Sequence, residues 1–237
     1  MFVRHAALGL LVAALAAGCG SSSSRDTDTA SPATLQGAPP AQQAPAASRP
    51  RVVFLGDSLT AGLGVAPSEA FPALVGEKLR AAGFDAQVVN AGISGDTAAG
   101  GRRRLDWALE GDVRVLVLAL GANDGLRGNP VGAMKADLQA IIRQARARGI
   151  SVLLLGMEAP PNFGPEYTAE FREAFRDLAD DEDVAFVPFF LDGVAGDPSF
   201  NQGDGLHPNA AGARRIADTV WTALAPLVEE RLAGRPQ

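Results

Sequence analysis

Residues 51–59 read RVVFLGDSL, a run of four apolar residues at 52–55 followed by a glycine, an aspartate and a serine. A short, continuous apolar run that ends at glycine is typical of a strand buried on both faces, and such strands occur in parallel sheets covered by helices. The carboxyl ends of parallel strands form the edge at which α/β proteins bind their ligands. The stretch therefore predicts an α/β fold and places Ser58 at the functional edge of the sheet, where a helix begins.

The rest of the chain repeats this alternation of short apolar runs and longer amphipathic ones, which is typical of β-α-β units. The predicted strands are residues 52–55, 86–89, 113–120, 151–155 and 184–187. The predicted helices are residues 69–82, 97–110, 133–148, 166–179 and 209–232. Two prolines are notable, because Pro72 fits best in a first helical turn and Pro226 should break or kink the last helix. We expect a flavodoxin-like three-layer sandwich with a five-stranded parallel sheet.

The N-terminus carries a charged start, an apolar run and small residues before a cysteine. Residues 1–18 are therefore interpreted as a secretory signal, too short to remain as a membrane span. Cys19 is the single cysteine, so a disulfide within the chain is excluded. The sequence LAAGC at residues 15–19 resembles the lipobox of bacterial lipoproteins, which implies cleavage before Cys19 and its lipidation. The alternative is a plain secreted protein cut near Ala17.

Residues 20–50 consist largely of Ser, Thr, Ala, Pro and Gln and offer little to bury, so we expect a disordered tether. A flexible tether of about thirty residues reaches on the order of 30 Å. The predicted organisation is a signal at 1–18, a lipidated cysteine and linker at 19–50, and one folded domain at 51–237. We expect a bacterial cell-envelope protein, lipid-anchored to a membrane and facing the periplasm, with a soluble periplasmic or secreted protein as the alternative.

Several classes of partner and cofactor are excluded by composition. The net charge is −6 and no basic stripe is present, so nucleic acid is not an expected partner. The cluster Arg102-Arg103-Arg104 is interpreted as a solvated helical face rather than an anion site. The chain lacks a phosphate-binding GxxxxGK[ST] loop. With one histidine beyond the signal and one N-terminal cysteine, neither a zinc site nor any other cofactor is expected.

That histidine, His207, stands in the sequence DGLHP at residues 204–208. A neutral imidazole can take the proton of a nucleophile when an aspartate holds its other ring nitrogen. Ser58 would be the nucleophile, His207 the base and Asp204 the orienting partner. The alternative is structural, since Asp-Gly and His-Pro are also ordinary turn dipeptides.

Acyl transfer also needs hydrogen-bond donors that face the developing oxyanion. The candidates are the backbone N–H groups of Ser58 and Gly92 and the side-chain amide of Asn123. Each has a plain structural alternative, because glycine and asparagine are common turn residues and serine is a common helix cap. Ser94 is a weak rival nucleophile, since residues 92–96 nearly spell GxSxG but end in aspartate.

Four blocks in order resemble the SGNH, or GDSL, hydrolase family: GDSL at 56–59, Gly92 after a strand, GAND at 121–124 and DGLH at 204–207. The resemblance extends from residue 51 to about residue 232. The longer sequences around these four blocks resemble the branch of the family that contains bacterial thioesterase I, lysophospholipases and arylesterases. It implies a nucleophilic Ser58, an oxyanion hole completed by Gly92 and Asn123, and Asp204 and His207 as the other triad members. It also implies that residues 125–130 help to shape the acyl site.

The expected function is therefore that of a serine esterase that cleaves ester or thioester bonds of small, lipid-like or aryl substrates through an acyl-enzyme. Two alternatives stay open. The same triad could remove O-acetyl groups from carbohydrates of the cell envelope, or the chain could be a non-catalytic envelope lipoprotein that keeps the fold for binding.

Overall fold

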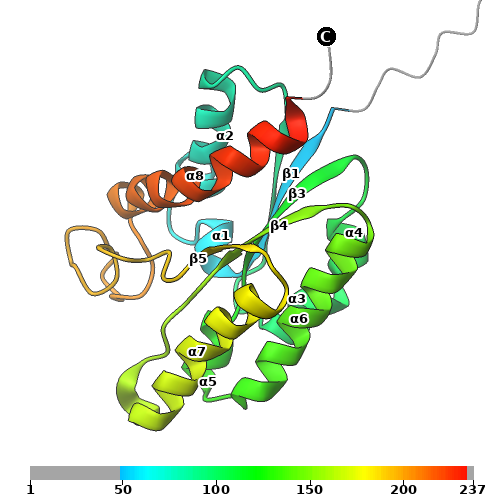
Figure 1. Ribbon diagram of the computed structural model, residues 1–237. Helices are drawn as coiled ribbons and strands as arrows, with labels where there is room; N and C mark the ends of the chain where they lie inside the picture. The colour runs from blue at the N-terminus through cyan, green and yellow to red at the C-terminus, as the bar shows by residue number, and fades with distance from the viewer. Residues whose placement is uncertain (1–48, 234–237) are drawn as a thin grey trace, which may run out of the picture. The chain divides into compact units, whose positions relative to one another are not determined.

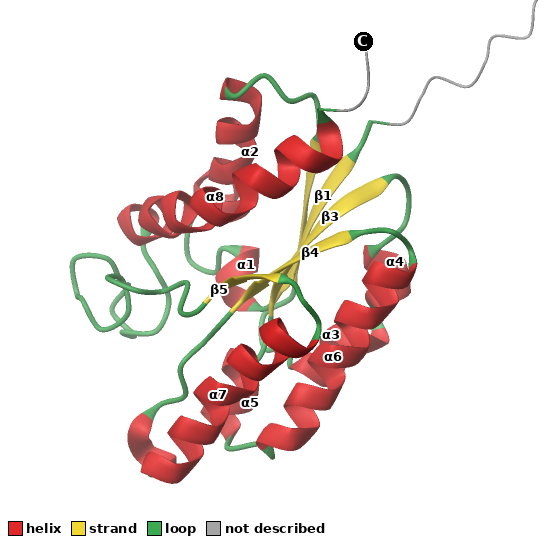
Figure 2. Cartoon of the chain, in the orientation of Figure 1, coloured by secondary structure: helices red, strands yellow, loops and turns green. Residues whose placement is uncertain are grey.

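Five parallel strands form the centre of the fold in this computed structural model, which describes residues 49–233 (Figures 1 and 2). The strands are β1 (Arg51–Gly56), β2 (Gln87–Gly92), β3 (Val113–Ala119), β4 (Ser151–Leu155) and β5 (Ala185–Val187). Their order in the sheet is β2-β1-β3-β4-β5, which is the flavodoxin-like order. The predicted sandwich with a five-stranded parallel sheet is confirmed. The predicted signal, Cys19 and the linker up to residue 48 lie outside the described residues.

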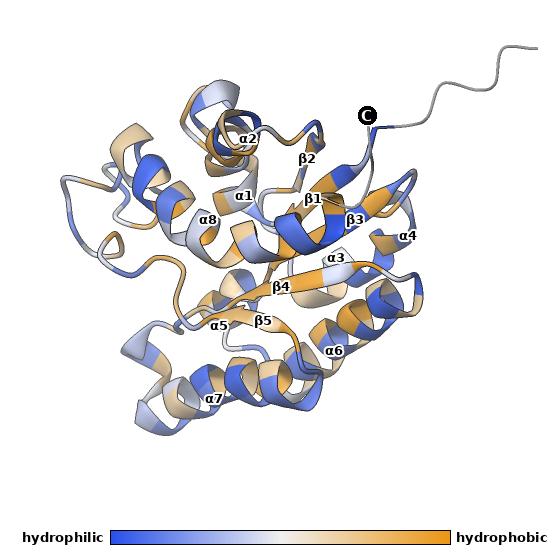
Figure 3. Cartoon of the chain, turned by 45° about the horizontal axis from the view of Figure 1, so that its top comes forward, coloured by the Kyte–Doolittle hydropathy of each residue, from blue (hydrophilic) through white to orange (hydrophobic). Residues whose placement is uncertain are grey.

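Helices cover both faces of this sheet. Helices α2 (Phe71–Ala81) and α8 (Ala210–Leu232) pack against each other on one face, while α3 (Ala98–Arg103), α6 (Val131–Ala147) and α7 (Pro165–Asp181) form the opposite layer (Figures 1 and 3). The short elements are α1 (Ser58–Ala61), η1 (Pro67–Glu69), α4 (Leu105–Ala108), α5 (Ala122–Arg127) and η2 (Pro161–Phe163). Figure 3 shows the hydrophobic residues concentrated on the strands between the two layers. No helix within residues 49–233 is long and apolar enough to cross a membrane.

The core explains why the strands could be identified from sequence. Val52, Val53, Phe54 and Leu55 of β1 are fully buried, and so are Val115, Leu116, Val117 and Leu118 of β3. Both faces of these central strands therefore need apolar side chains, which produces continuous runs rather than the alternation of a half-exposed strand.

Two features of the helices differ from the sequence prediction. The segment 97–110 forms two short helices, α3 and α4, joined at Arg104. Helix α8 continues through Pro226, so of the predicted break or kink the break is wrong. Pro226 is exposed, and water can therefore bind the carbonyl of Thr222 that has lost its helical N–H partner. Pro72 does lie in the first turn of α2, as predicted.

The carboxyl edge of the sheet gathers the loops that carry polar residues. The chain leaves β1 for β2 on one side and reaches β3 on the other, so the direction of winding changes beside β1. At this edge Gly56 lies opposite Gly92 of β2 and Ala119 of β3. A change of winding direction opens a crevice at the strand ends, which is where open α/β sheets bind ligands.

Candidate active site

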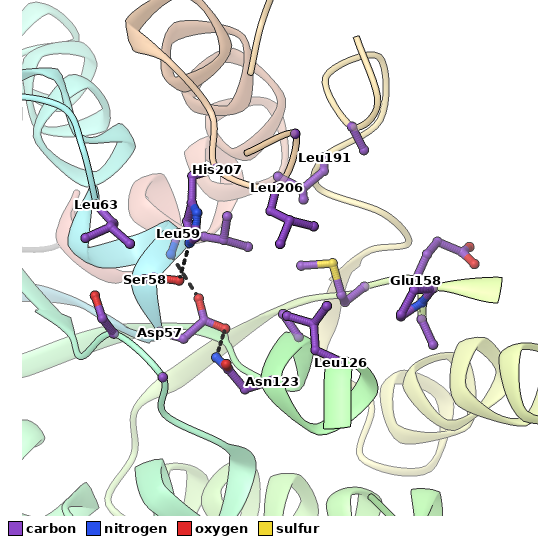
Figure 4. Close-up of a pocket in the computed structure, with 18 of the residues that line it drawn as sticks. Asp57, Ser58, Leu59, Leu63, Asn123, Leu126, Glu158, Leu191, Leu206 and His207 are labelled. Atoms are coloured by element: carbon purple, nitrogen blue, oxygen red, sulfur yellow. Dashed lines mark hydrogen bonds between the residues drawn. The ribbon is translucent and has the colours of Figure 1, made fainter. Parts of the chain in front are cut away.

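Ser58 is the first residue of α1, directly after β1. The preceding Asp57 caps this helix, because its Oδ1 accepts the N–H of Leu59 at 3.0 Å. The helix has only one turn and ends at Gly62, which adopts a left-handed conformation. The backbone thus turns sharply at the end of β1, and the Ser58 side chain faces the pocket at the sheet edge (Figure 4).

Asp204 and His207 lie in the long segment between β5 and α8. Gln202 fastens this segment at two points: its backbone N–H donates to the carbonyl of His207 at 2.8 Å, and its side-chain amide donates to the carbonyl of Leu63 at 2.7 Å. Leu63 follows α1 closely in the chain. Gln202 therefore ties the histidine loop to the turn that carries Ser58.

The three predicted triad residues form one line of hydrogen-bonded groups. His207 Nε2 lies 3.0 Å from Ser58 Oγ, and His207 Nδ1 lies 2.6 Å from Asp204 Oδ2 (Figure 4 shows the serine and histidine). Asp204 Oδ1 also accepts the backbone N–H groups of Leu206 and His207 at 2.9 and 3.0 Å. The His207 N–H and ring, followed by the Leu206 N–H, hold the pKa of Asp204 well below its usual range. Asp204 is therefore a stable anion beside the imidazole.

One backbone N–H that the sequence analysis proposed as an oxyanion donor already binds a side chain in the fold. The N–H of Gly92 donates to Asn90 Oδ1 at 3.0 Å, and Gly92 does not line the pocket. A β-carbon at position 92 would lie 2.3 Å from the backbone nitrogen of Ala61, so this glycine is required for close packing of β2 against α1. Gly95 lines the pocket instead, and its N–H donates to no acceptor among residues 49–233.

Asn123 is in the pocket lining at the start of α5, close behind β3. Its Nδ2 donates to the carbonyl of Asp96 at 3.0 Å and makes a long contact of 3.4 Å with Asp57 Oδ2 (Figure 4). A hydrogen bond of that length is weak, so one amide hydrogen is available to a ligand.

Asp57 lies between the serine and this asparagine and is 1% exposed. Burial raises the pKa of Asp57 from 3.8 to about 6, against the opposing hydrogen bonds from Leu59 and Asn123. Its contacts, a helix cap and a link to Asn123, support the interpretation of Asp57 as a structural acceptor.

A pocket of about 420 Å³ opens beside Ser58, His207 and Asn123. Its apolar lining consists of Leu59, Leu63, Ala122, Leu126, Met157, Ala159, Pro160, Phe189, Leu191, Ala195 and Leu206. Leu126 belongs to α5, so the first half of the predicted loop 125–130 is helical and does contribute to the pocket wall. Glu158 lines the pocket away from Ser58 (Figure 4). Its carboxylate accepts two hydrogen bonds from Arg172, of 2.6 and 2.7 Å. The described part of the chain holds no cluster of three or more His, Cys, Asp or Glu suited to a metal ion.

Comparison with known proteins shows the family to which this chain belongs. Residues 54–215 match the model of the GDSL-like lipase/acylhydrolase family. The chain belongs to this family. The GDSL hydrolase is 43% identical over 178 residues to the esterase TesA of Pseudomonas aeruginosa, a match covering 75% of this chain and 89% of the relative. It is 38% identical to thioesterase 1/protease 1/lysophospholipase L1 of Escherichia coli K12, covering 77% of this chain and 87% of that protein.

Solved structures agree with this family assignment. The crystal structure of TesA superposes with a TM-score of 0.72 at 43% identity, covering 76% of this chain and 99% of that one. The psychrotrophic esterase EstA from Pseudoalteromonas sp. gives a TM-score of 0.72 at 34% identity, covering 76% of this chain and 98% of EstA. The predicted resemblance is confirmed, and this GDSL hydrolase is an enzyme that acts on ester bonds.

The structure also corrects the interpretation of the arginine cluster in this GDSL hydrolase. Arg102 and Arg103 are exposed, as predicted, but the side chain of Arg104 is only 14% exposed. Arg104 lies where α3 ends and α4 begins, and its guanidinium points to the strand ends rather than to solvent. Charge clustering in the sequence gave no signal for this, because the helix break at Arg104 decides which way the side chain points.

Proposed function

We propose that this hydrolase is a serine esterase in which Ser58 attacks the substrate carbonyl and His207 acts as the base. The observation that carries the proposal is the continuous line of contacts from Asp204 Oδ2 through the His207 ring to Ser58 Oγ, with distances of 2.6 and 3.0 Å, at an apolar pocket. An ionised Asp204 favours the tautomer with hydrogen on Nδ1, which leaves Nε2 free to accept the serine proton.

The reaction then proceeds in two balanced halves. Ser58 Oγ bonds to the carbonyl carbon while its proton moves to His207 Nε2, and the carbonyl oxygen becomes an oxyanion. Collapse of this intermediate breaks the bond to the alcohol or thiol, which leaves with the proton from His207. Water next attacks the acyl-enzyme, giving its proton to His207, and the acid is released as Ser58 Oγ is reprotonated.

The oxyanion hole comprises the backbone N–H groups of Ser58 and Gly95 and the side-chain amide of Asn123. Among residues 49–233, the N–H groups of Ser58 and Gly95 have no acceptor, and the second hydrogen of Asn123 Nδ2 has only the long contact to Asp57. Three donors on three neighbouring loops suit an oxygen that carries developing charge. This assignment replaces Gly92 with Gly95.

The substrate class follows from the pocket. Its predominantly apolar lining favours an acyl chain over a sugar, and its volume is that of a small-molecule site. Esters and thioesters of aliphatic acids are therefore proposed as substrates, in line with the esterase and thioesterase names of the relatives. Release of fatty acid from lysophospholipid or acyl thioester, compared with release of acetate from an acetylated glycan, distinguishes this proposal from carbohydrate deacetylation.

One experiment tests the catalytic assignment. Wild type, Ser58→Ala and His207→Ala are assayed with p-nitrophenyl butyrate, and wild type is labelled with an alkyl phosphonate and digested for mass spectrometry. We expect the label on Ser58 and loss of nearly all activity in both variants. A label on Ser94, or activity surviving in Ser58→Ala, would refute the assignment. A wild type that does not react with the phosphonate would instead support the non-catalytic alternative.

We also propose that Cys19 carries a lipid that anchors the enzyme in a bacterial cell envelope, facing the periplasm. The LAAGC sequence and the polar stretch 20–48 support this proposal. Metabolic labelling with an alkyne fatty acid should mark wild type but not Cys19→Ser, and equal labelling of both would contradict the anchor.

A further inference from the structure

Arg104 joins the ends of two strands to the loop that follows β2. Its Nη2 donates to the carbonyl of Gly56 at 2.9 Å, and its Nη1 donates to the carbonyl of Ala91 at 2.7 Å. Its Nε donates to Asp96 Oδ2 at 2.7 Å, in an ion pair whose side chains are 14% and 15% exposed. One planar guanidinium thus binds three acceptors, in β1, in β2 and in the loop after β2. A lysine ammonium does not present its N–H groups in the fixed fork geometry that these three hydrogen bonds require.

Each of these acceptors is close in the chain to a proposed oxyanion donor. Gly56 comes two residues before Ser58, and Asp96 comes directly after Gly95. The carbonyl of Asp96 in turn accepts Asn123 Nδ2 at 3.0 Å. Arg104 therefore contacts the segments that carry the two backbone donors, and it reaches the side-chain donor through Asp96.

A glycine in the neighbouring helix indicates that this arrangement is built into the fold. A β-carbon at Gly100 of α3 would lie 1.8 Å from Asp96 Oδ1. Glycine inside a helix costs about 1 kcal/mol relative to alanine. Because Gly100 has no side chain, the Asp96 carboxylate can lie against α3 and accept the hydrogen bond from Arg104.

We propose that Arg104 is a positioning residue that sets the relative placement of the three oxyanion donors, acting through Gly56, Ala91 and Asp96. The proposal rests on the serine esterase function proposed above. Arg104 does not touch the triad: its contacts are with the strand ends and with Asp96. Loss of Arg104 should therefore weaken binding of the transition state more than binding of substrate or product.

The test compares Arg104→Met and Arg104→Lys with the matched control Arg102→Met. Arg102 is the exposed arginine two residues earlier, and it pairs with Asp137 on the surface at 2.9 Å. Turnover of p-nitrophenyl octanoate is measured per active site, with sites counted by phosphonate titration. Inhibition constants are measured for an octyl trifluoromethyl ketone, which forms an oxyanion with Ser58, and for octanoate, which is the product.

Removal of one oxyanion donor typically lowers turnover by about 10²- to 10³-fold, so displacement of the donors should give about a 10- to 100-fold loss in Arg104→Met. The affinity for the ketone should fall in parallel, while KM and the affinity for octanoate change by less than about threefold. Arg104→Lys should recover only part of the loss, and Arg102→Met should match wild type.

Two results would overturn the proposal: turnover per site within about twofold of wild type in Arg104→Met, or an equal loss of affinity for ketone and octanoate. If Arg104→Met does not fold, Arg104→Lys keeps the charge and the stem and is judged by the same two criteria. Failure of the serine mechanism itself would show differently, as activity in Ser58→Ala whatever the state of Arg104.

Discussion

His207 Nε2 lies 3.0 Å from Ser58 Oγ although 149 residues separate the two in the chain. Ser58 is fixed by the end of a fully buried strand, whereas His207 reaches it from a long segment that Gln202 ties to Leu63. The alignment of the imidazole therefore depends on contacts within that segment, and above all on Asp204.

Asp204→Asn should reduce kcat for p-nitrophenyl butyrate by about 10³- to 10⁴-fold without unfolding the protein. The asparagine oxygen can still accept the N–H groups of Leu206 and His207, but its NH₂ group would face His207 Nδ1. The ring would then carry its hydrogen on Nε2 and could not accept the serine proton. The control is Asp197→Asn in the same segment, whose carboxylate accepts the N–H and the hydroxyl of Ser199. Less than a tenfold loss in Asp204→Asn would contradict this role.

Asn123→Ala should lower kcat by about 10²- to 10³-fold with little change in KM, because one donor to the oxyanion is lost. Asn129→Ala is a suitable control, since Asn129 binds Asp124 Oδ1 behind α5 and does not line the pocket. Steady-state kinetics with p-nitrophenyl butyrate measure both variants. A pure KM effect in Asn123→Ala would indicate that the amide binds the ground state instead.

Glu158→Ala should shift the preference of the enzyme toward longer acyl chains. Glu158 and its partner Arg172 separate the acyl pocket from a neighbouring hollow, and Glu158 and Phe189 line both. Each additional buried methylene is worth about 0.8 kcal/mol, so room for two more should raise the ratio of kcat/KM for p-nitrophenyl laurate over butyrate by about tenfold. Glu173→Ala on the exposed side of α7 is the control. An unchanged ratio would show that the ion pair does not limit chain length.

Asp57 should make stability depend on pH in the range from about 4 to 7. Burial raises the pKa of Asp57 from 3.8 to about 6 in the folded protein, so the neutral carboxyl favours folding. Its contribution is fully present below pH 4 and is lost as pH rises through about 6. The difference between a pKa of 3.8 and one of about 6 corresponds to roughly 3 kcal/mol of folding free energy. In urea unfolding, the free energy of unfolding of the wild type should fall by up to that amount relative to Asp57→Asn between pH 4 and 7. Parallel plots of this free energy against pH for the two proteins would contradict the prediction.

The strands and the main helices were predictable because local burial patterns encode them. The fully buried run at 52–55 allows few alternatives to a central strand, and the apolar face of the helix predicted at 133–148 identifies its packed side. The short helix α5 was missed because six residues around Gly121 and Gly125 also read as a turn. The break at Pro226 was wrongly predicted because the exposure of this residue, which makes a proline tolerable inside α8, is a property of the fold.

The site divides in the same way. Ser58, Asn123, Asp204 and His207 were proposed from sequence because each follows a strand or precedes a helix in a distinctive local string, and the structure places all four at the sheet edge near the pocket. Gly92 and Gly95 could not be distinguished from sequence, since the two glycines stand only three residues apart. The fold shows that Gly92 ends β2 and packs on Ala61, whereas Gly95 lines the pocket. Arg104 was assigned to the surface with its neighbours, although its guanidinium binds carbonyls of β1 and β2.

The sequence by itself determined a parallel α/β sheet with a serine at the carboxyl edge of its first strand. Buried strands and the turns that follow them depend on the pattern of consecutive residues, which can be read without knowing the fold. Only the tertiary structure decided which glycine N–H stays free, which arginine turns inward and how the imidazole meets the serine. Those outcomes depend on contacts between segments far apart in the chain, and no local pattern specifies such contacts.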